Sequence, residues 1–417
     1  MNHCEDVLRP VNHPFETAMR EALDQARRGR FMTAPNPNVG AVLVRDGEIV
    51  ARGYHKGAGL PHAEIEALRD AQEKGVDPAV CTMVVTLEPC CHHGQTPPCT
   101  DALLAAGIRH VVIGALDPNP TAGGGAELLR ARGVQVETGI LRAECEDLIS
   151  DFVTWQTSPY PYVILKLAST LDGRIATRTG HSQWITGTAA RRRVHQVRRF
   201  MDAVMVGGNT FHYDSPSLDY RPEAGDPPAE RQPLAVIVTS RLPDASVVSP
   251  ILRDRPEQAL FWSTVASAAS PKAEALRKRG ARVLGLSSTP GPGAASHGPR
   301  AELDLAEGLT ALRKDHGCHY LLCEGGGRLG LSLLRDRLVG ELHLHMSSRI
   351  LGDNEAIPLF DGLSPHQMDE AFPLRFVASE MLEDDLLLTL RPLAAPAADA
   401  PATESCEGPA RNDGGTR

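Results

Sequence analysis

Pro89-Cys90 and Pro98-Cys99, preceded by His62-Ala63-Glu64, decide the fold and chemistry of this chain's first half. One imidazole and two thiolates are ligands that zinc prefers, and a site with three protein ligands keeps a fourth position open for water. Glu64 follows the histidine by two residues and can move protons at that water. We therefore predict His62, Cys90 and Cys99 as metal ligands and Glu64 as the catalytic residue, the pattern of the zinc deaminases.

The spacing of the two cysteines leaves other interpretations open. Eight residues separate Cys90 from Cys99, whereas zinc deaminases mostly use Cys-x-x-Cys. Cys91, His92 and His93 lie inside this loop, and any of them could complete a structural zinc site with four ligands. A catalytic zinc is the interpretation we favour, and a structural zinc or no metal are the alternatives.

The segments around these motifs alternate between strand and helix patterns. Strands are expected at 39–44, 48–54, 81–87 and 111–116, with Asp46-Gly47 as a hairpin turn between the first two, and helices at 15–28, 63–74, 100–106 and 127–132. Alternation of this kind predicts an α/β domain with helices on both faces of a sheet. His62 and Cys99 then fall near the starts of two helices, whose dipoles favour anionic ligands.

A second α/β series begins near residue 162, after a stretch at 157–161 with two prolines that we take as the linker. Strands are expected at 162–168, 203–206, 234–239, 258–262 and 320–323, with a basic helix at 189–200. These patterns predict one domain at 12–156 and another at 161–394. Residues 285–300 are expected to form a surface loop, and 395–417 a disordered tail.

Composition narrows the class of protein. The chain has 417 residues, enough for two domains with separate cores, and a net charge of -9 argues against a nucleic-acid partner. Its nine cysteines are an odd number, so a reducing compartment suits them better than a disulfide framework does. Neither a signal peptide nor an apolar run long enough to span a bilayer is recognisable. We expect a soluble cytoplasmic protein without a membrane partner.

Two features of the second half suggest anion binding. One short helix carries five arginines, which form either a solvated face or a phosphate site: Arg191, Arg192, Arg193, Arg198 and Arg199. Glu324-Gly325-Gly326-Gly327-Arg328-Leu329-Gly330 follows a strand and opens a helix. Glycines at such a turn let backbone amides approach a pyrophosphate, although the same pattern also makes ordinary tight turns.

The complete loop Thr86-Leu87-Glu88-Pro89-Cys90-Cys91-His92-His93-Gly94-Gln95-Thr96-Pro97-Pro98-Cys99 resembles the bifunctional riboflavin-biosynthesis deaminase/reductase (RibD) family. So do His62-Ala63-Glu64 and Asn36-Pro37-Asn38-Val39-Gly40-Ala41-Val42. The resemblance implies a cytidine-deaminase-like α/β/α domain, zinc on His62, Cys90 and Cys99, Glu64 as proton donor and Asn36 in the substrate pocket. Cys91 stands where the family more often has serine, which marks it as a non-ligand, and Gln95 where it usually has arginine.

The second half resembles the reductase half of the same family. The motifs are Lys166-Leu167-Ala168, Leu171-Asp172-Gly173-Arg174-Ile175-Ala176, Gln183-Trp184-Ile185-Thr186-Gly187, Ala190-Arg191-Arg192, Pro216-Ser217-Leu218 with Arg221, and Glu324-Gly325-Gly326. They imply a fold similar to dihydrofolate reductase, with NADPH as hydride donor. Asn209, Ser215 and Asp219 depart from the family pattern.

The resemblance also assigns residues in the second half. Cofactor contacts are implied for Ala168, Trp184, Thr210, Asp214, Gly326, Gly327, Arg328, Leu329, Gly330, Leu331 and Ser332. Substrate contacts are implied for Ser182, Arg198, Leu218, Arg221, Glu324 and Lys166, with Arg198 and Arg221 suited to a phosphate and Lys166 and Glu324 to proton transfer. NADPH carries a 2′-phosphate that needs a nearby cation, for which Arg241 is the candidate.

Our main hypothesis is a homo-oligomeric enzyme that carries out two steps on one phosphoribosyl pyrimidine. The first step depends on zinc and the second on NADPH. The first half would deaminate 2,5-diamino-6-(5-phosphoribosylamino)pyrimidin-4-one, and the second would reduce its ribosyl group to ribityl. One alternative is a nucleoside or base deaminase with a degenerate second domain. Another is a zinc-stabilised RNA-binding or regulatory protein, which the acidic balance disfavours.

Overall fold

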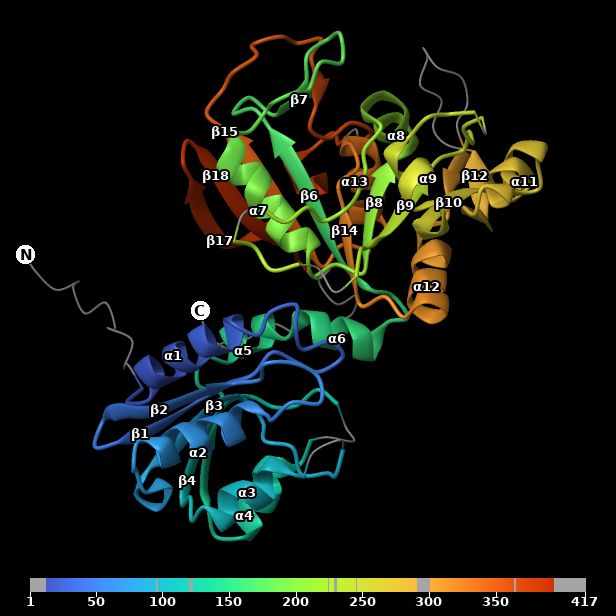
Figure 1. Ribbon diagram of the computed structural model, residues 1–417. Helices are drawn as coiled ribbons and strands as arrows, with labels where there is room; N and C mark the ends of the chain where they lie inside the picture. Colours follow the sequence, from blue (N-terminus) through green and yellow to red (C-terminus); the bar gives the residue numbers. More distant parts are fainter. Residues whose placement is uncertain are drawn as a thin grey trace, which may run out of the picture.

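The computed structural model describes residues 13–94, 97–119, 123–223, 225–228, 231–244, 246–290, 301–363 and 365–393. It consists of two α/β halves joined through helix α6 (Ser150–Thr157) (Figure 1). Gln95 and the predicted tail at 395–417 lie outside the described residues.

The first half is built on a five-stranded sheet with the order β2-β1-β3-β4-β5. Its strands are β1 (Gly40–Arg45), β2 (Glu48–Tyr54), β3 (Thr82–Leu87), β4 (His110–Ala115) and β5 (Gln135–Thr138). Asp46 and Gly47, both at positive φ, make the turn of the antiparallel pair β1–β2 and confirm the predicted hairpin. Strands β3, β4 and β5 run parallel.

Helices cover both faces of this sheet, as predicted. Helices α1 (Glu16–Arg27) and α5 (Arg142–Leu148) lie on one face, and α2 (Ala63–Glu73), α3 (Cys99–Ala105) and α4 (Gly125–Ala131) on the other (Figure 1). A 3₁₀ turn, η1 (Pro78–Val80), precedes β3. Side chains alternate between the two layers: Val84 packs with the α1 side of the core and Val85 with the α2 side.

The second half has a nine-stranded sheet with the order β11-β10-β9-β8-β14-β6-β15-β18-β17. The strands are β6 (Tyr162–Ser169), β8 (Ala203–Gly207), β9 (Leu234–Val238), β10 (Ala259–Thr264), β11 (Arg282–Leu286), β14 (Tyr320–Cys323), β15 (Glu341–Ser347), β17 (Leu374–Leu382) and β18 (Asp385–Pro392). The sheet is parallel from β11 to β15, and β18 and β17 add an antiparallel edge. Two small ribbons pair β7 (Arg174–Ala176) with β16 (Ile357–Pro358), and β12 (Ser288–Pro290) with β13 (Ala301–Leu303).

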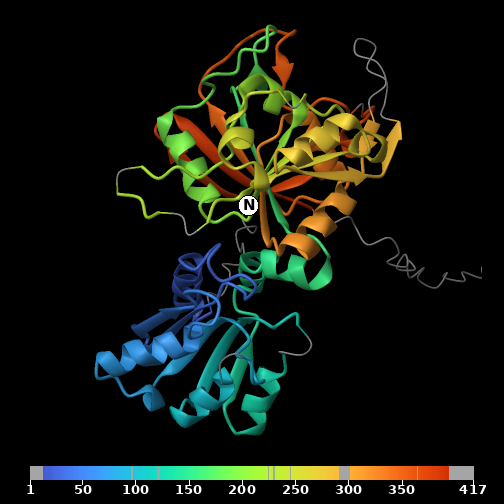
Figure 2. The same ribbon diagram turned by 45° about the vertical axis from the view of Figure 1, so that its right-hand side comes forward.

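Helices pack around this sheet (Figure 2). They are α7 (Thr188–Arg198), α8 (Gly208–Asp214), α9 (Pro250–Asp254), α10 (Val265–Ala268), α11 (Pro271–Lys278), α12 (Leu305–His316) and α13 (Gly327–Arg335), with the 3₁₀ turns η2 (Pro256–Gln258) and η3 (Met368–Glu370). The largely parallel sheet with its helices confirms the predicted α/β class of the second half.

The two halves share apolar packing, which differs from the two separate cores expected from the sequence. One cluster of buried side chains runs from Met19 on α1, through Phe152 and Trp155 on α6, to Tyr162 and Tyr320 in the second sheet. The rings of Trp155 and Tyr320 meet edge to face, 5.1 Å apart. Since the apolar side chains of α6 pack against both halves, this helix holds the two halves together.

Several elements were not anticipated, for physical reasons. Strand β17 is exposed from Phe376 to Met381 at the sheet edge, so it has no buried periodicity to recognise. The predicted surface loop at 285–300 is wrong for its first residues, because β11 continues to the buried Leu286 and residues 288–290 pair as β12, while residues 291–300 lie outside the described residues. Within the described ranges, no helix is both long and apolar enough to cross a membrane.

Candidate active sites

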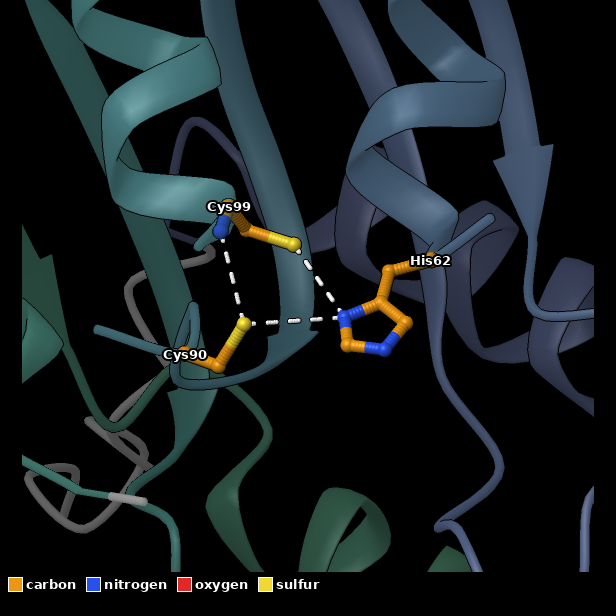
Figure 3. Close-up of side chains that lie close together, drawn as sticks. All are labelled: His62, Cys90 and Cys99. Atoms are coloured by element: carbon orange, nitrogen blue, oxygen red, sulfur yellow. Dashed lines mark hydrogen bonds between the residues drawn. The ribbon is translucent and has the colours of Figure 1, made fainter. Parts of the chain in front are cut away.

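The predicted metal ligands come from three elements that meet at one edge of the first sheet. His62 is the residue that precedes α2, Cys99 is the first residue of α3, and Cys90 lies in the loop after β3. The backbone amide of Thr100 bonds to the carbonyl of Cys90 at 3.2 Å, which ties the loop to the start of α3. Figure 3 shows the three side chains pointing toward a common centre.

The ligand atoms have the spacing of a tetrahedral metal site. His62 Nδ1 lies 3.2 Å from Cys99 Sγ and 3.6 Å from Cys90 Sγ, and all three atoms lie within 4.8 Å of one another. Zinc bonds of about 2.0–2.3 Å to nitrogen and sulfur would separate tetrahedral ligands by roughly 3.3–3.8 Å. Hydrogen bonds from Cys99 and His62 lower the pKa of Cys90, while the hydrogen bond to Cys90 raises that of Cys99, so the pair favours a thiolate on one of the two sulfurs. The residues present therefore fit zinc.

The candidates for a fourth protein ligand, Cys91, His92 and His93, lie outside the ligand group. In the part of the chain that the structure describes, His62, Cys90 and Cys99 form the only group of three or more potential ligands at this spacing. His92 and His93 are exposed, and Cys91 Sγ lies 3.2 Å from the carbonyl oxygen of Gly123. A three-ligand arrangement favours the open, catalytic form of site over the structural one.

Glu64 stands beside this group in the first turn of α2. Its side chain is buried, with 3% of the residue exposed. Burial raises the pKa of the carboxyl above its usual range, while the nearby His62 acts in the opposite direction. A buried carboxyl next to an open metal position is suited to moving protons.

A loop between α1 and β1 closes another side of the site. Asn36 Nδ2 lies 3.2 Å from His55 Nε2, and His55 Nδ1 lies 3.1 Å from the carbonyl oxygen of Pro61, next to His62. A cavity of about 450 Å³ also adjoins His62, between α2 and α3. Neither Glu64 nor Asn36 lines that cavity, so it is separate from the side that carries the predicted substrate residue.

The second candidate site lies at the carboxyl ends of parallel strands in the larger sheet. Ala168 is near the end of β6, Thr210 lies in α8 just after β8, and Glu324 follows β14. Arg241 follows β9 and is exposed, as is Asp214 at the end of α8. Because these strands are neighbours in the sheet, the predicted residues share one edge, where open α/β sheets bind ligands.

The glycine-rich turn opens α13, with Gly326 as the residue before the helix. A Cβ atom on Gly327 would stand 1.9 Å from the carbonyl oxygen of Leu359, so a side chain there is excluded. Gly330 packs against Leu165, and Leu331 is buried. The later positions of the run 326–332 thus contribute packing, and the first-turn amides are the groups that can face an anion.

Arg198 and Glu324 form a two-pronged ion pair, with only 11% and 12% of their side chains exposed. Arg198 Nε and Nη2 donate to the two carboxylate oxygens at 2.5 and 2.8 Å, and Nη1 donates to the carbonyl of Asp219 at 3.1 Å. Burial disfavours the charge of Glu324, but Arg198 and Lys166 together hold its pKa below the usual value. Burial also lowers the pKa of Lys166. Every nitrogen of Arg198 is thus engaged within the protein, which weakens its predicted phosphate role.

Arg221 is placed differently. Its side chain is 65% exposed, with Nε 3.5 Å from Asp219 Oδ1 and Nη2 3.4 Å from His195 Nε2. Asp219, one of the departures from the family pattern, therefore orients this arginine. Leu218 is buried, so a ligand contact there would come from its backbone.

The other arginines of α7 contact residues outside the Arg198–Glu324 pair. Arg191 stacks on the exposed ring of Trp184 at 4.5 Å, and Arg192 and Arg193 face Glu223 and Glu380. Ser182 lies two residues before Trp184 in the same partly exposed segment. Of the five arginines, Arg198 is the one that joins the predicted substrate residues.

Comparisons with known proteins identify the family of this chain. Residues 161–388 match the RibD C-terminal domain family, and residues 13–115 match the cytidine and deoxycytidylate deaminase zinc-binding region. The riboflavin biosynthesis protein RibD of Actinobacillus pleuropneumoniae is 38% identical over 375 residues, covering 89% of this chain and 93% of that protein. The Escherichia coli RibD is 38% identical over 351 residues, covering 81% and 89%. The chain belongs to the RibD family.

Solved RibD structures share the architecture. The Thermotoga maritima diaminohydroxyphosphoribosylaminopyrimidine deaminase/5-amino-6-(5-phosphoribosylamino)uracil reductase superposes with a TM-score of 0.70 at 33% identity, covering 92% of this chain and 99% of that one. Acinetobacter baumannii RibD gives a TM-score of 0.69 at 33% identity, covering 91% and 99%. As a RibD family member, the chain is a bifunctional deaminase/reductase of riboflavin biosynthesis, and the predicted family and fold class are confirmed.

Sequence reasoning missed one anchor of the RibD deaminase loop. Glu88, buried next to Pro89-Cys90, accepts hydrogen bonds from the backbone amides of Asp117, Gly124 and Ala126 at 3.1, 3.1 and 2.8 Å. The carboxylate thereby fixes the start of α4 against the loop that carries Cys90. An acidic residue directly after a buried apolar strand was the available signal.

Proposed function

We propose that the first half hydrolyses the 2-amino group of 2,5-diamino-6-(5-phosphoribosylamino)pyrimidin-4(3H)-one, giving 5-amino-6-(5-phosphoribosylamino)uracil. The second half then reduces the ribosyl side chain to ribityl with NADPH. The observation that carries the proposal is the three-ligand group beside the buried Glu64. The name of the Thermotoga maritima relative, which states both reactions, supports the choice of substrate.

In the deaminase site, His62, Cys90 and Cys99 hold zinc, which when bound supplies Lewis-acid activation of water. Glu64 is the group that carries protons: it takes one from the attacking water and gives it to the pyrimidine ring nitrogen, then takes the second from the newly added hydroxyl and gives it to the departing amine. Asn36, fixed by His55 at 3.2 Å, holds the pyrimidine in place. Burial of Glu64 keeps bulk water away from these transfers.

In the reductase site, NADPH when bound would supply a hydride for the ribose carbon. Lys166 and Glu324 transfer the proton that accompanies the hydride. Arg198 orients Glu324 through its two hydrogen bonds. The exposed guanidinium of Arg221 binds the substrate phosphate. The first-turn amides of α13 would hold the cofactor pyrophosphate, and Arg241 would pair with its 2′-phosphate.

The proposed units are a deaminase domain at 12–156 and a reductase domain at 161–394, in a homo-oligomer. The break between α6 and β6 supports this division. A soluble enzyme acting on a small molecule in the cytoplasm fits the odd cysteine count and the acidic balance.

The proposal is tested by supplying the diamino substrate to the full-length zinc-loaded chain. We expect ammonia release first, and NADPH consumption after the deaminated intermediate has formed. Deamination without NADPH consumption, even with added intermediate, would instead identify a deaminase with a degenerate second domain. Absence of both activities, with RNA bound, would support the regulatory alternative.

A further inference from the structure

The loop between α1 and β1, residues 28–39, contacts both halves of the chain. At one end of it, Asn36 bonds to His55 in the deaminase site at 3.2 Å. At the other end, Arg30 Nη2 donates to Glu341 Oε1 of β15 at 2.6 Å. The ring of Phe31 meets Tyr320 of β14 edge to face, 5.2 Å away. A loop of the first half is therefore held by strands of the second.

A chain of buried hydrogen bonds joins the same strand to the same loop. The Tyr320 hydroxyl donates to Asp151 Oδ2 on α6, and Asn38 Nδ2 donates to that oxygen at 3.2 Å. Thr33 Oγ1 in turn donates to Asn38 Oδ1 at 3.1 Å. All four residues are at most 5% exposed. The backbone amide of Asn36 then bonds to the carbonyl of Thr33 at 2.8 Å, which brings the chain of bonds to the deaminase site.

Burial makes this arrangement sensitive to the loss of any one donor. Asp151 has little access to water, and burial raises the pKa of its carboxyl above the usual range. Its Oδ2 atom depends on Tyr320 and Asn38, while Oδ1 accepts from the backbone amide of Phe152 at 2.8 Å. Removing the hydroxyl leaves a buried acceptor short of a donor, which favours rearrangement of the remaining partners.

We propose that Tyr320 and Asp151 are positioning residues of the deaminase, through which the reductase half fixes loop 33–38 and so the position of Asn36. This inference rests on the substrate pocket proposed above, in which Asn36 contacts the pyrimidine. It assigns the reductase half a second task, because its β14 strand completes the support of a site in the other half. Deamination by this chain therefore depends on the docked reductase half.

The test compares two buried tyrosine hydroxyls in the full-length, zinc-loaded chain. Tyr320→Phe removes the donor to Asp151. Tyr162→Phe is the matched control, since Tyr162 is equally buried, lies 6.4 Å from Tyr320 between ring centres, and bonds to the neighbouring Ser150 of α6 at 3.2 Å. Both variants lose one hydroxyl between the halves, but among the described residues the Ser150 hydroxyl bonds to Tyr162, whereas the link to loop 33–38 runs through Asp151.

Tyr320→Phe should lower deaminase kcat/KM about tenfold, within the range that small misplacements of contacting groups cost. The larger part should be in KM, because Asn36 contacts substrate while Glu64 and the metal ligands are untouched. Zinc content and NADPH consumption with the deaminated intermediate should stay at wild-type values. Tyr162→Phe should match the wild type in all of these.

Thr33→Val provides a second variant that leaves the reductase half unaltered. It removes the hydroxyl that bonds to Asn38 and should raise the deaminase KM in the same way. Equal deaminase kinetics for Tyr320→Phe and Tyr162→Phe would overturn the inference, as would a parallel loss of both activities. A wild-type chain without deaminase activity would overturn the proposed function itself, and this inference with it.

Discussion

Arg198 binds the carboxylate of Glu324 through two parallel hydrogen bonds of 2.5 and 2.8 Å, in surroundings where both side chains are nearly buried. A pair of this geometry fixes the plane of the carboxylate as well as its charge. The relationship separates Arg198 from Arg221, whose guanidinium is mostly exposed. The two arginines should therefore respond differently to substitution.

Arg198→Lys should lower the reductase kcat by at least about tenfold, because lysine cannot make the two-pronged contact that orients Glu324. Arg221→Ala should mainly raise KM for the phosphorylated substrate. The measurement is steady-state NADPH consumption with the deaminated intermediate. If Arg198→Lys changed KM alone, Arg198 would be a phosphate ligand after all.

Glu64→Gln should abolish deamination, with a loss of roughly 10²–10⁴ in kcat, since an amide cannot transfer the protons. Zinc content, thermal unfolding and the reductase activity should be unchanged. Glu66→Gln is the control on the same helix, because Glu66 pairs with Lys56 and Arg69. Retained deamination in Glu64→Gln would exclude the proposed proton carrier.

Cys99→Ala should remove zinc and deamination together while reduction remains measurable. Cys91→Ser should retain both, because Cys91 faces the carbonyl of Gly123 and lies outside the ligand group. Metal analysis of the purified variants checks this directly. Loss of zinc from Cys91→Ser would revive the four-ligand structural site.

Glu341 should make stability depend on pH. The residue is fully buried, and although burial opposes its charge, Arg30, His343 and Arg391 hold its pKa well below the ordinary 4.5. A lowered pKa means that the stabilisation is fully present above pH 4.5 and is lost as the pH falls toward the folded-state pKa. Glu341→Gln should therefore cost roughly 1–3 kcal/mol at neutral pH, because it removes a buried carboxylate that accepts hydrogen bonds from Arg30 and Arg391, although Arg391 keeps its contact with Asp147.

Urea unfolding of the wild type and Glu341→Gln at a series of pH values measures this effect. The difference in unfolding free energy should narrow as the pH is lowered below 4.5. A difference that stays constant over that interval would show that the carboxylate charge is not the cause.

Features that depend on a local sequence pattern or on ligand chemistry could be predicted from the sequence. The hairpin at Asp46-Gly47 and the convergence of His62, Cys90 and Cys99 followed from turn chemistry and ligand type. The partner of Arg198 did not, because 126 positions separate it from Glu324 along the chain. The path from Tyr320 to Asn38 was equally hidden, since its members read as ordinary strand, helix and loop residues until tertiary packing brings them together.

Helix α6 also has a consequence for anyone who divides this protein at the linker. Each fragment would present to solvent the aromatic surface on which Phe152, Trp155, Tyr162 and Tyr320 now close. Such exposed patches promote self-association. Poor recovery of separated fragments would then reflect aggregation through this exposed apolar surface. Inactivity of an isolated fragment would say little about its chemistry.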